Sequence, residues 1–254
     1  MLIKITDRCS MGCNHCLSDC TPNLRDMEWD TFNDAMDFYD KYCKDASKPI
    51  IISGGEPTES KIFYGVVSSL ISYTSLNKDT MIPITITTNG LWLSKNEQVV
   101  KDLKEYLPTC TVQIVVDDRY YPTHVDESSP IFKYDNVVLC RDVMQIYPQG
   151  RALQNNLPFR AKASKCFNIR AITKQMKDSS LSDILLQMTL KYKFCTPHID
   201  IDGNIKLGES RLCPVCSNIY KTEKEIIDDI INFQCHQCDF LNENLPEMYK
   251  RFVE

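Results

Sequence analysis

Three cysteines near the start of the chain, Cys9, Cys13 and Cys16, share a short loop with the spacing CxxxCxxC. Thiols this close in sequence can reach one metal centre, so any fold that carries them has to be built around that centre. An iron–sulfur cluster is normally held by four cysteine thiolates. A tight triplet therefore predicts a [4Fe-4S] cluster with one iron left open to another molecule. Cys20 is near enough to supply a fourth thiolate, which is the structural alternative.

The composition favours a cytoplasmic enzyme over a secreted or membrane protein. No apolar run reaches the roughly 18 residues that a membrane-spanning helix needs, and no signal peptide precedes the cysteine triplet. The chain has 254 residues and thirteen cysteines, which gather toward both ends and so indicate metal sites rather than disulfides. A net charge of −5 provides no electrostatic footprint for nucleic acid.

Hydrophobic periodicity predicts alternating strands and helices. The expected strands are residues 2–6, 49–53, 82–87, 111–116, 137–147 and 167–173, and the expected helices are residues 29–42, 62–73, 94–106 and 182–192. Ser94 followed by Glu97 matches a capping box at the start of the third of these helices. Repeated βα units with apolar strands predict an α/β fold with a parallel sheet, either open or closed into a barrel.

Polar and glycine-rich motifs follow the first four predicted strands. Gly54-Gly55-Glu56-Pro57 begins where the second strand stops, Asn89 follows the third, and Asp117 and Asp118 follow the fourth. Functional loops of parallel α/β folds gather at the carboxyl ends of the strands. We therefore expect these motifs to share one edge of the sheet with the cysteine loop.

Taken together, the cysteine triplet and the GGEP motif resemble those of radical S-adenosylmethionine (radical SAM) enzymes over roughly residues 1–175. The resemblance implies a partial (β/α)6 TIM-like barrel, with Cys9, Cys13 and Cys16 holding a [4Fe-4S] cluster whose open iron binds SAM. The SAM contacts that it implies come from His15 near the adenine, Gly54, Gly55, Glu56 and Pro57 near the methionine, and Asn89 and Asp117 elsewhere in the pocket. The GxIxGxxE pattern of the fifth strand is absent.

Other residues are candidates for contact with the substrate. Gln149-Gly150-Arg151-Ala152 resembles a GRA segment of peptide-modifying members, which implies that Arg151 reaches the SAM carboxylate or the substrate; the structural alternative is a cap on the sheet edge. Several polar and aromatic residues follow the fourth strand and are expected to line the substrate pocket: Asp118, Arg119, Tyr120, Tyr121 and His124. Beyond the cluster and SAM, no catalytic residue is assigned.

A second group of cysteines predicts a separate C-terminal module. A hairpin pattern at residues 198–207 lies between Cys195 and Cys213, and two CxxC pairs, Cys213 to Cys216 and Cys235 to Cys238, follow. The paired CxxC units alone suit zinc. The whole arrangement also resembles a Twitch or truncated SPASM module, which implies an auxiliary [4Fe-4S] cluster on Cys195, Cys213, Cys235 and Cys238, with Cys216 as a substitute. The expected domains are residues 1–190 for the radical SAM core and 191–254 for a small module with a β-hairpin and helices.

The resemblance implies reductive cleavage of SAM to a 5′-deoxyadenosyl radical that takes a hydrogen atom from a substrate. It also implies an electron donor such as flavodoxin or ferredoxin. Modules of the Twitch and SPASM kind favour oxidation, crosslinking or epimerisation of a ribosomally made peptide. The alternative is dehydrogenation of a small molecule such as a sugar alcohol or aminoglycoside. A zinc-binding or cluster-binding interaction protein without catalysis is the third interpretation.

Overall fold

The fold was analysed in a computed structural model. It describes residues 1–44, 49–77, 81–141, 146, 150–158, 178–191, 197–206 and 214–233, with backbone alone for 187–191.

A single eight-stranded sheet organises the described part of the chain, with the strand order β5-β4-β3-β2-β1-β6-β7-β8. The strands are β1 (Leu2–Lys4), β2 (Ile50–Ser53), β3 (Ile84–Thr88), β4 (Cys110–Val115), β5 (Val137–Cys140), β6 (His198–Ile199), β7 (Asn204–Lys206) and β8 (Val215–Asn218). The pairs from β5 through β1 to β6 are parallel, whereas β7 and β8 are antiparallel to their neighbours. The sheet is an unclosed barrel, which agrees with the predicted α/β fold class.

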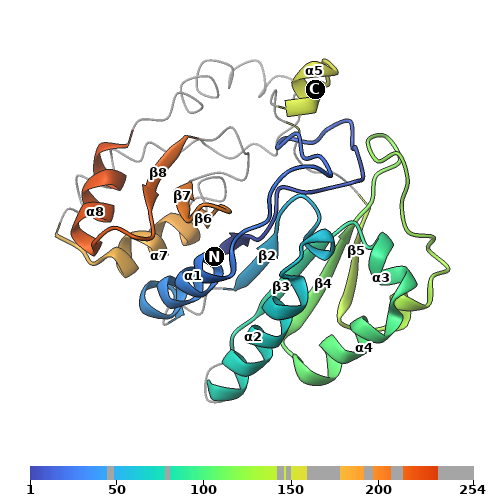
Figure 1. Ribbon diagram of the computed structural model, residues 1–254, viewed down its shortest axis with the longest axis horizontal. Coiled ribbons are helices and arrows are strands. Elements are labelled where there is room, and N and C mark those ends of the chain that lie inside the picture. The colour runs from blue at the N-terminus through green and yellow to red at the C-terminus, as the bar shows by residue number, and fades with distance from the viewer. Residues whose placement is uncertain are drawn as a thin grey trace.

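Helices follow the strands, and several of them cover one face of the sheet. They are α1 (Trp29–Tyr42), α2 (Phe63–Leu76), α3 (Leu91–Lys95), α4 (Glu97–Tyr106), α5 (Gly150–Gln154), α7 (Leu181–Lys191) and α8 (Glu223–Asn232), with short 3-10 turns at Pro57–Glu59 and Pro130–Lys133. Figure 1 shows α1, α2 and α4 along β1–β5, and α7 and α8 at the other end beside β6–β8.

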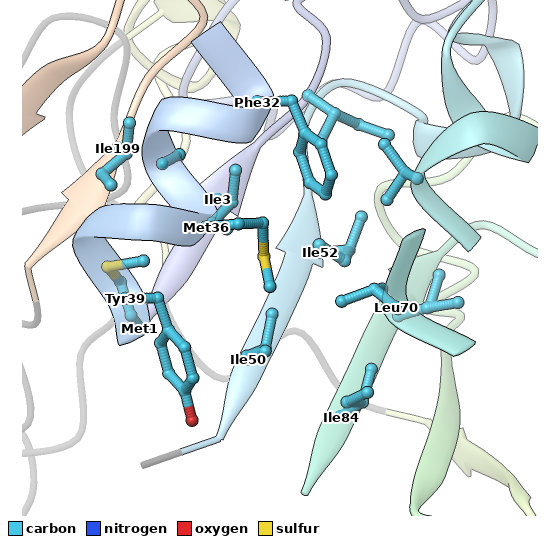
Figure 2. Packing of buried hydrophobic residues seen from close by; sticks show 14 of the residues in the cluster. Met1, Ile3, Phe32, Met36, Tyr39, Ile50, Ile52, Leu70, Ile84 and Ile199 are labelled. Carbon is cyan, nitrogen blue, oxygen red and sulfur yellow. The ribbon is translucent and has the colours of Figure 1, made fainter. Parts of the chain in front are cut away.

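The main core lies between the sheet and α1, α2 and α4 (Figure 2). Alternate strand residues such as Ile3, Ile52 and Ile84 point toward the helices and are almost completely buried. Phe32 and Tyr39 of α1 pack on them. Each such side chain contributes about 1.5–3 kcal/mol by leaving water. The residues between them face the opposite, concave side of the sheet, because side chains alternate along a strand.

Most predicted elements are confirmed with small shifts at their ends, but the third helix is not one continuous element. It is divided into α3 and α4, and Ser94 lies inside α3, where its hydroxyl donates to the Leu91 carbonyl oxygen at 2.9 Å. The predicted cap at Ser94 is therefore wrong: α4 begins after Asn96, whose side chain makes no capping hydrogen bond. The strand predicted at residues 167–173 lies outside the described residues.

The hairpin predicted at residues 198–207 is present, and it extends the main sheet. Its first strand, β6, pairs in parallel with β1, with Leu2 opposite His198 and Ile3 opposite Ile199. The division into domains at residue 190 stays a prediction, with this shared sheet running across it. Among the described residues, no helix is long and apolar enough to cross a membrane.

Candidate functional site

The cysteine loop leaves β1 and returns to it. The returning segment pairs with the end of β1: the Asp7 amide donates to the Arg25 carbonyl oxygen at 2.9 Å, and the Met27 amide donates to Ile5 at 2.9 Å. This closed stem holds residues 8–24 at the carboxyl end of the sheet. The loop that carries the thiols is thus fixed by backbone hydrogen bonds at its base.

The three thiols of the triplet lie together in this loop. Cys9 and Cys13 are buried, Cys16 is half-buried, and they share an apolar cluster with Met11 and Cys20. Cys20 is therefore brought beside the triplet, as the alternative with four thiolates requires. Its backbone amide donates to the Cys16 sulfur at 3.5 Å.

Burial and local hydrogen bonds set the protonation of these thiols. Burial raises the pKa of Cys9 to about 11 and that of Cys13 to about 12, so both are protonated at neutral pH. A hydrogen bond from the Cys20 side chain lowers the pKa of Cys16 to about 5 and raises the pKa of Cys20. Because cluster ligands bind as thiolates, occupation of the loop by iron would release protons.

The donor set fits a [4Fe-4S] cluster better than a single metal ion. No three His, Cys, Asp or Glu side chains in the described ranges stand close enough to hold one ion. In a cluster of four irons each thiolate binds its own iron, so the sulfur atoms need not meet at one point. Three soft thiol donors on one loop, without imidazole or carboxylate among them, match iron–sulfur ligation.

Gly54 and Gly55 allow the end of β2 to run directly against the base of the cysteine loop. The Gly55 amide donates to the Thr6 carbonyl oxygen and the Glu56 amide donates to Arg8, both at 2.8 Å. A Cβ atom at Gly54 would stand 2.5 Å from the Thr6 oxygen, and one at Gly55 would collide with the Arg8 carbonyl group. The two glycines are therefore required by backbone approach, whatever they bind.

Glu56 ties the end of β2 to the end of β3. Its carboxylate is 2% exposed and accepts hydrogen bonds from the Thr88 hydroxyl at 2.6 Å, the Asn89 amide at 2.7 Å and the Thr58 hydroxyl at 2.7 Å. Burial raises its pKa in spite of these donors. The predicted strand-end motifs thus meet in space, joined by one carboxylate.

A cavity of about 470 Å³ opens between the cysteine loop and the concave face of the sheet. Predicted site residues that line it are Cys9, Cys13, His15, Cys16, Gly54, Gly55, Glu56, Asn89 and Arg151. Tyr121, expected beyond the fourth strand, lines it as well. A further set of lining residues was not predicted from the sequence, namely Leu2, Lys4, Met11, Leu17, Ser18, Ser53, Thr87, Thr88, Gln113, Val115 and Cys140. Several of these are the alternate strand residues that face away from the helices, so the alternation of polar and apolar residues along β3 and β4 was the signal that could have found them.

His15 packs between two tyrosines at the wall of the cavity. Its ring centroid lies 5.4 Å from that of Tyr120 and 5.1 Å from that of Tyr121. Burial lowers its pKa to about 4, so the imidazole is neutral at physiological pH. Its buried Nδ1 atom has no hydrogen-bond partner within the described residues. A neutral ring beside a cavity fits contact with a flat aromatic group.

Arg151 holds the cysteine loop in place through hydrogen bonds to the loop. Its Nε donates to the Cys13 carbonyl oxygen at 2.9 Å, and its Nη1 donates to Asp19 and to the Cys20 carbonyl oxygen at 3.0 Å. The preceding Gly150 has φ +53°, and a Cβ atom there would stand 2.5 Å from the Cys16 carbonyl oxygen. The GRA segment therefore holds the loop, and Arg151 also faces the cavity.

Other predicted residues of the fourth strand end do not line the cavity. The Asp117 carboxylate is buried against the Arg119 guanidinium, with 2.7 Å between Oδ1 and Nε. Asp118 pairs with His124 at 3.3 Å on the surface. Tyr120 is buried and touches His15.

Pro57 is buried at the start of the short turn after β2, and it does not line the cavity. Its predicted SAM contact stays a prediction, as do those of the strand-four residues.

The C-terminal metal site falls mainly on residues that the structure does not describe. Cys195, Cys213, Cys235 and Cys238 all lie outside the described residues. Cys216 is described: it belongs to β8, is buried, and packs with the main core. Its assignment as a substitute ligand stays a prediction.

Comparison with known families and proteins finds similarity over the first half of the chain. Residues 3–120 match the family described as the radical SAM superfamily. The chain is 27% identical over 137 residues to GTP 3′,8-cyclase of Haemophilus influenzae, which is 54% of this chain and 38% of that protein. It is 26% identical over 96 residues to GTP 3′,8-cyclase of Psychromonas ingrahamii. The matches span well under half the length of these relatives.

Solved structures extend the likeness in fold over most of the chain. The crystal structure of BtrN in complex with AdoMet and 2-DOIA has a TM-score of 0.53 at 15% identity, covering 92% of this chain and 81% of that one. Streptococcus suis SuiB bound to precursor peptide SuiA has a TM-score of 0.39 at 15% identity, covering 93% and 69%. At these identities the BtrN match speaks for the fold alone.

Proposed function

Residues 3–120 match the radical SAM superfamily, and we propose that the chain belongs to it, reductively cleaves SAM and uses the resulting radical to modify a substrate held under the cysteine loop. The observation that carries the proposal is the single cavity lined by the three thiols of the triplet together with Gly54, Gly55 and Glu56. Residues far apart in sequence line this one cavity.

The protein supplies position and shielding rather than acid–base chemistry. When bound, a reduced [4Fe-4S] cluster and SAM supply a 5′-deoxyadenosyl radical that removes a hydrogen atom from the substrate. We assign Cys9, Cys13 and Cys16 to the cluster, and the GGEP turn with Asn89 to the amino-acid end of SAM. His15 is assigned to the adenine, because its neutral ring borders the cavity. Enclosure by the loop keeps bulk water from a reactive radical.

Two substrate classes remain in the proposal. The modification of a ribosomally made peptide, inferred from the resemblance of the C-terminal cysteines, stays a prediction. A small polar molecule is the second candidate, and one observation favours it: a second, smaller cavity with buried charged side chains adjoins the first through Lys4. The auxiliary cluster on Cys195, Cys213, Cys235 and Cys238, with zinc as its alternative, is likewise proposed, as is a flavodoxin-like or ferredoxin-like electron donor.

Anaerobic reconstitution with iron and sulfide tests the central claim. About four irons per chain are expected for each cluster, and addition of dithionite and SAM should yield 5′-deoxyadenosine. The matched control is the Cys13→Ala variant, which should lose about four irons per chain and all 5′-deoxyadenosine formation. Absence of 5′-deoxyadenosine from a fully loaded, reducible protein would refute the enzyme and leave the non-catalytic interpretation.

The same preparation separates the two proposals for the C-terminal site. About eight irons per chain support an auxiliary cluster, whereas about four irons with one zinc support a zinc site. Incubation with peptides and with small polar molecules, followed by mass analysis for the loss of hydrogen, then distinguishes the substrate classes.

A further inference from the structure

A second cavity, of about 300 Å³, lies between the cysteine loop's returning segment and the β6–β7 hairpin. It is lined by Lys4, Asp7, Leu24, Arg25, His198, Asp200, Ile201, Asp202 and Lys206. On the exposed side, Arg25 of the loop and Asp202 of the hairpin turn form an ion pair at 3.0 Å. This volume is at the lower end of the roughly 300–1,000 Å³ of small-molecule sites.

Two buried ion pairs make the wall of this second cavity unusual. The Lys4 ammonium lies 2.7 Å from Asp7 and the Lys206 ammonium lies 3.3 Å from Asp200. Lys4 is only 4% exposed and Lys206 only 6%. Lysines are almost never buried to this extent without a partner, and a buried ion pair contributes little to stability because both charges lose hydration. Stability alone therefore gives a weak reason for placing two such pairs here.

His198 stands between these pairs with an unused hydrogen-bonding atom. Its side chain is 1% exposed, and its Nδ1 atom has no hydrogen-bond partner within the described residues. Burial lowers its pKa to about 3, and the neighbouring Lys4 and Lys206 lower it further in the same direction, against Asp200. Leaving a buried polar atom without a partner destabilises the folded state. The cost is offset if a bound molecule supplies the missing partner.

The second cavity is joined to the SAM cavity by a common wall. Lys4 lines both. His198 is aligned with Leu2 across the parallel pair and with Lys206 across the hairpin, so these side chains share the concave face with Lys4. The two cavities therefore adjoin at Lys4.

The side chains that line the second cavity indicate which kind of polar group a bound molecule would place there. A carboxylate or phosphate only accepts hydrogen bonds, and here it would meet Asp7 and Asp200 as well as the two lysines. A hydroxyl group both donates and accepts. It can therefore satisfy a neutral imidazole nitrogen and an ammonium or carboxylate at the same time.

We propose that this second cavity is the substrate subsite of the enzyme and binds the hydroxyl groups of a small polyhydroxylated molecule, with His198 as the central contact. The inference rests on the proposed function for its connection to catalysis. As a binding site, however, it stands on the geometry of the second cavity. His198, Lys4 and Lys206 are specificity-determining contacts in this proposal.

Ligand-observed saturation-transfer NMR on the anaerobically reconstituted full chain with SAM tests the proposal. The probes are myo-inositol, citrate and the tripeptide Ala-Ser-Ala. We expect myo-inositol to bind and His198→Phe to weaken that binding by about tenfold or more, because the ring is kept while the nitrogen is lost. His198→Asn, which keeps a hydrogen-bonding group, should stay within about threefold of the wild type.

Lys133→Met is the matched control for Lys206→Met, because Lys133 forms an exposed ion pair with Glu97 far from either cavity. The control should bind myo-inositol as the wild type does, and Lys206→Met should not. Thermal melting of each variant identifies any that fails to fold, and the His198→Phe and His198→Asn pair then carries the test by itself.

Three outcomes would overturn the proposal: binding of citrate or the tripeptide in preference to myo-inositol, no binding of any probe, or equal binding by folded His198→Phe protein. Formation of 5′-deoxyadenosine without any probe reports on the proposed function separately. His198-dependent binding in a protein that never cleaves SAM would preserve the site and refute the enzyme. SAM cleavage without His198-dependent binding would support the enzyme and refute the proposed substrate subsite.

Discussion

Glu56 and His198 are both almost completely buried polar side chains on the concave side of the same sheet, but their surroundings differ. Glu56, at the edge of the SAM cavity, receives hydrogen bonds from Thr58, Thr88 and Asn89. His198, in the second cavity, keeps an Nδ1 atom with no partner among the described residues. The donors to Glu56 come from its own chain and hold two strand ends together beside the cavity, whereas the Nδ1 atom of His198 has no such partner and is proposed to meet a ligand.

The same contrast applies to the two cavities as wholes. The first is built by fastened segments: a closed loop stem, two glycines that admit close backbone approach, and Arg151 across the loop. The second is a pocket of paired charges around one unsatisfied imidazole. We infer that the segments around the first cavity are fixed before anything binds, while each cavity leaves one imidazole, His15 or His198, for a ligand to complete.

The largest expected effect comes from removing a thiol of the triplet. Cys13→Ala should lower the iron content by about four per chain and abolish 5′-deoxyadenosine formation, because a cluster held by two thiolates is not retained. Iron analysis and electron paramagnetic resonance of the reduced protein provide the measurement. Cys20→Ala is the matched control and should keep both. If Cys20→Ala lost as much iron, the loop would use four thiolates and no iron would be open to SAM.

The second prediction tests whether the hydrogen bonds of Glu56 hold the ends of β2 and β3 together. Glu56→Gln replaces one acceptor oxygen by a donor that faces the Asn89 amide or the Thr88 hydroxyl. We expect a loss of about 2–4 kcal/mol in the free energy of unfolding, seen as a drop of roughly 5–10 °C in Tm for a chain of this length. Glu97→Gln, at an exposed ion pair, should leave the melting curve unchanged. An unchanged Tm for Glu56→Gln would show that the strand ends are held together by other contacts.

Substitution of Arg151 tests whether its hydrogen bonds hold the cysteine loop in place, without changing the thiols. Arg151→Lys keeps the positive charge but loses the fork that reaches Cys13 and Cys20. We expect the cluster to be lost to a chelator about 10–100 times faster, in the range known for groups that support metal ligands. The bleaching of the iron–sulfur absorbance measures that rate. Arg141→Lys, on the exposed surface, is the control. Equal rates for all three proteins would assign Arg151 to SAM or substrate alone.

The last prediction concerns pH, on which the stability of the two regions depends with opposite signs. Between pH 6.5 and about 3 the unfolded chain binds a proton on His198 that the folded protein does not bind. Stability should therefore fall on acidification, by up to about 1.4 kcal/mol per pH unit from this group. The charged groups that face His198 are Lys4, Lys206 and Asp200. His198→Phe should flatten the dependence of Tm on pH over this range.

Glu56 should contribute the reverse slope. Its folded pKa is raised, so just above the ordinary carboxyl pKa the folded state binds more proton than the unfolded state, and acidification stabilises it. Glu56→Gln removes that gain, so its stability should fall more steeply than that of the wild type as the pH is lowered. Parallel slopes for the two variants would contradict the contrast between the regions.

The sequence predicted the fold where the pattern is local. The helix at residues 29–42 was predicted with the ends that it has in the structure, because its apolar residues recur at helical spacing. Ser94 was misjudged because capping boxes are recognised by two residues alone, and a five-residue helix, α3, already occupies that position. The addition of β6 to the edge of β1 was not predicted, since pairing between strands so distant in sequence has no local signal.

By itself, the sequence predicted a cluster site and a resemblance to the radical SAM superfamily, because the three thiols share one loop and each further motif directly follows a strand. The tertiary structure alone decided how Arg151 and the two glycines are used, since their partners are backbone carbonyl groups that carry no sequence pattern. It also decided the second cavity. Lys4 and His198 are distant in the chain, and only the pairing of β1 with β6 places both on one concave face.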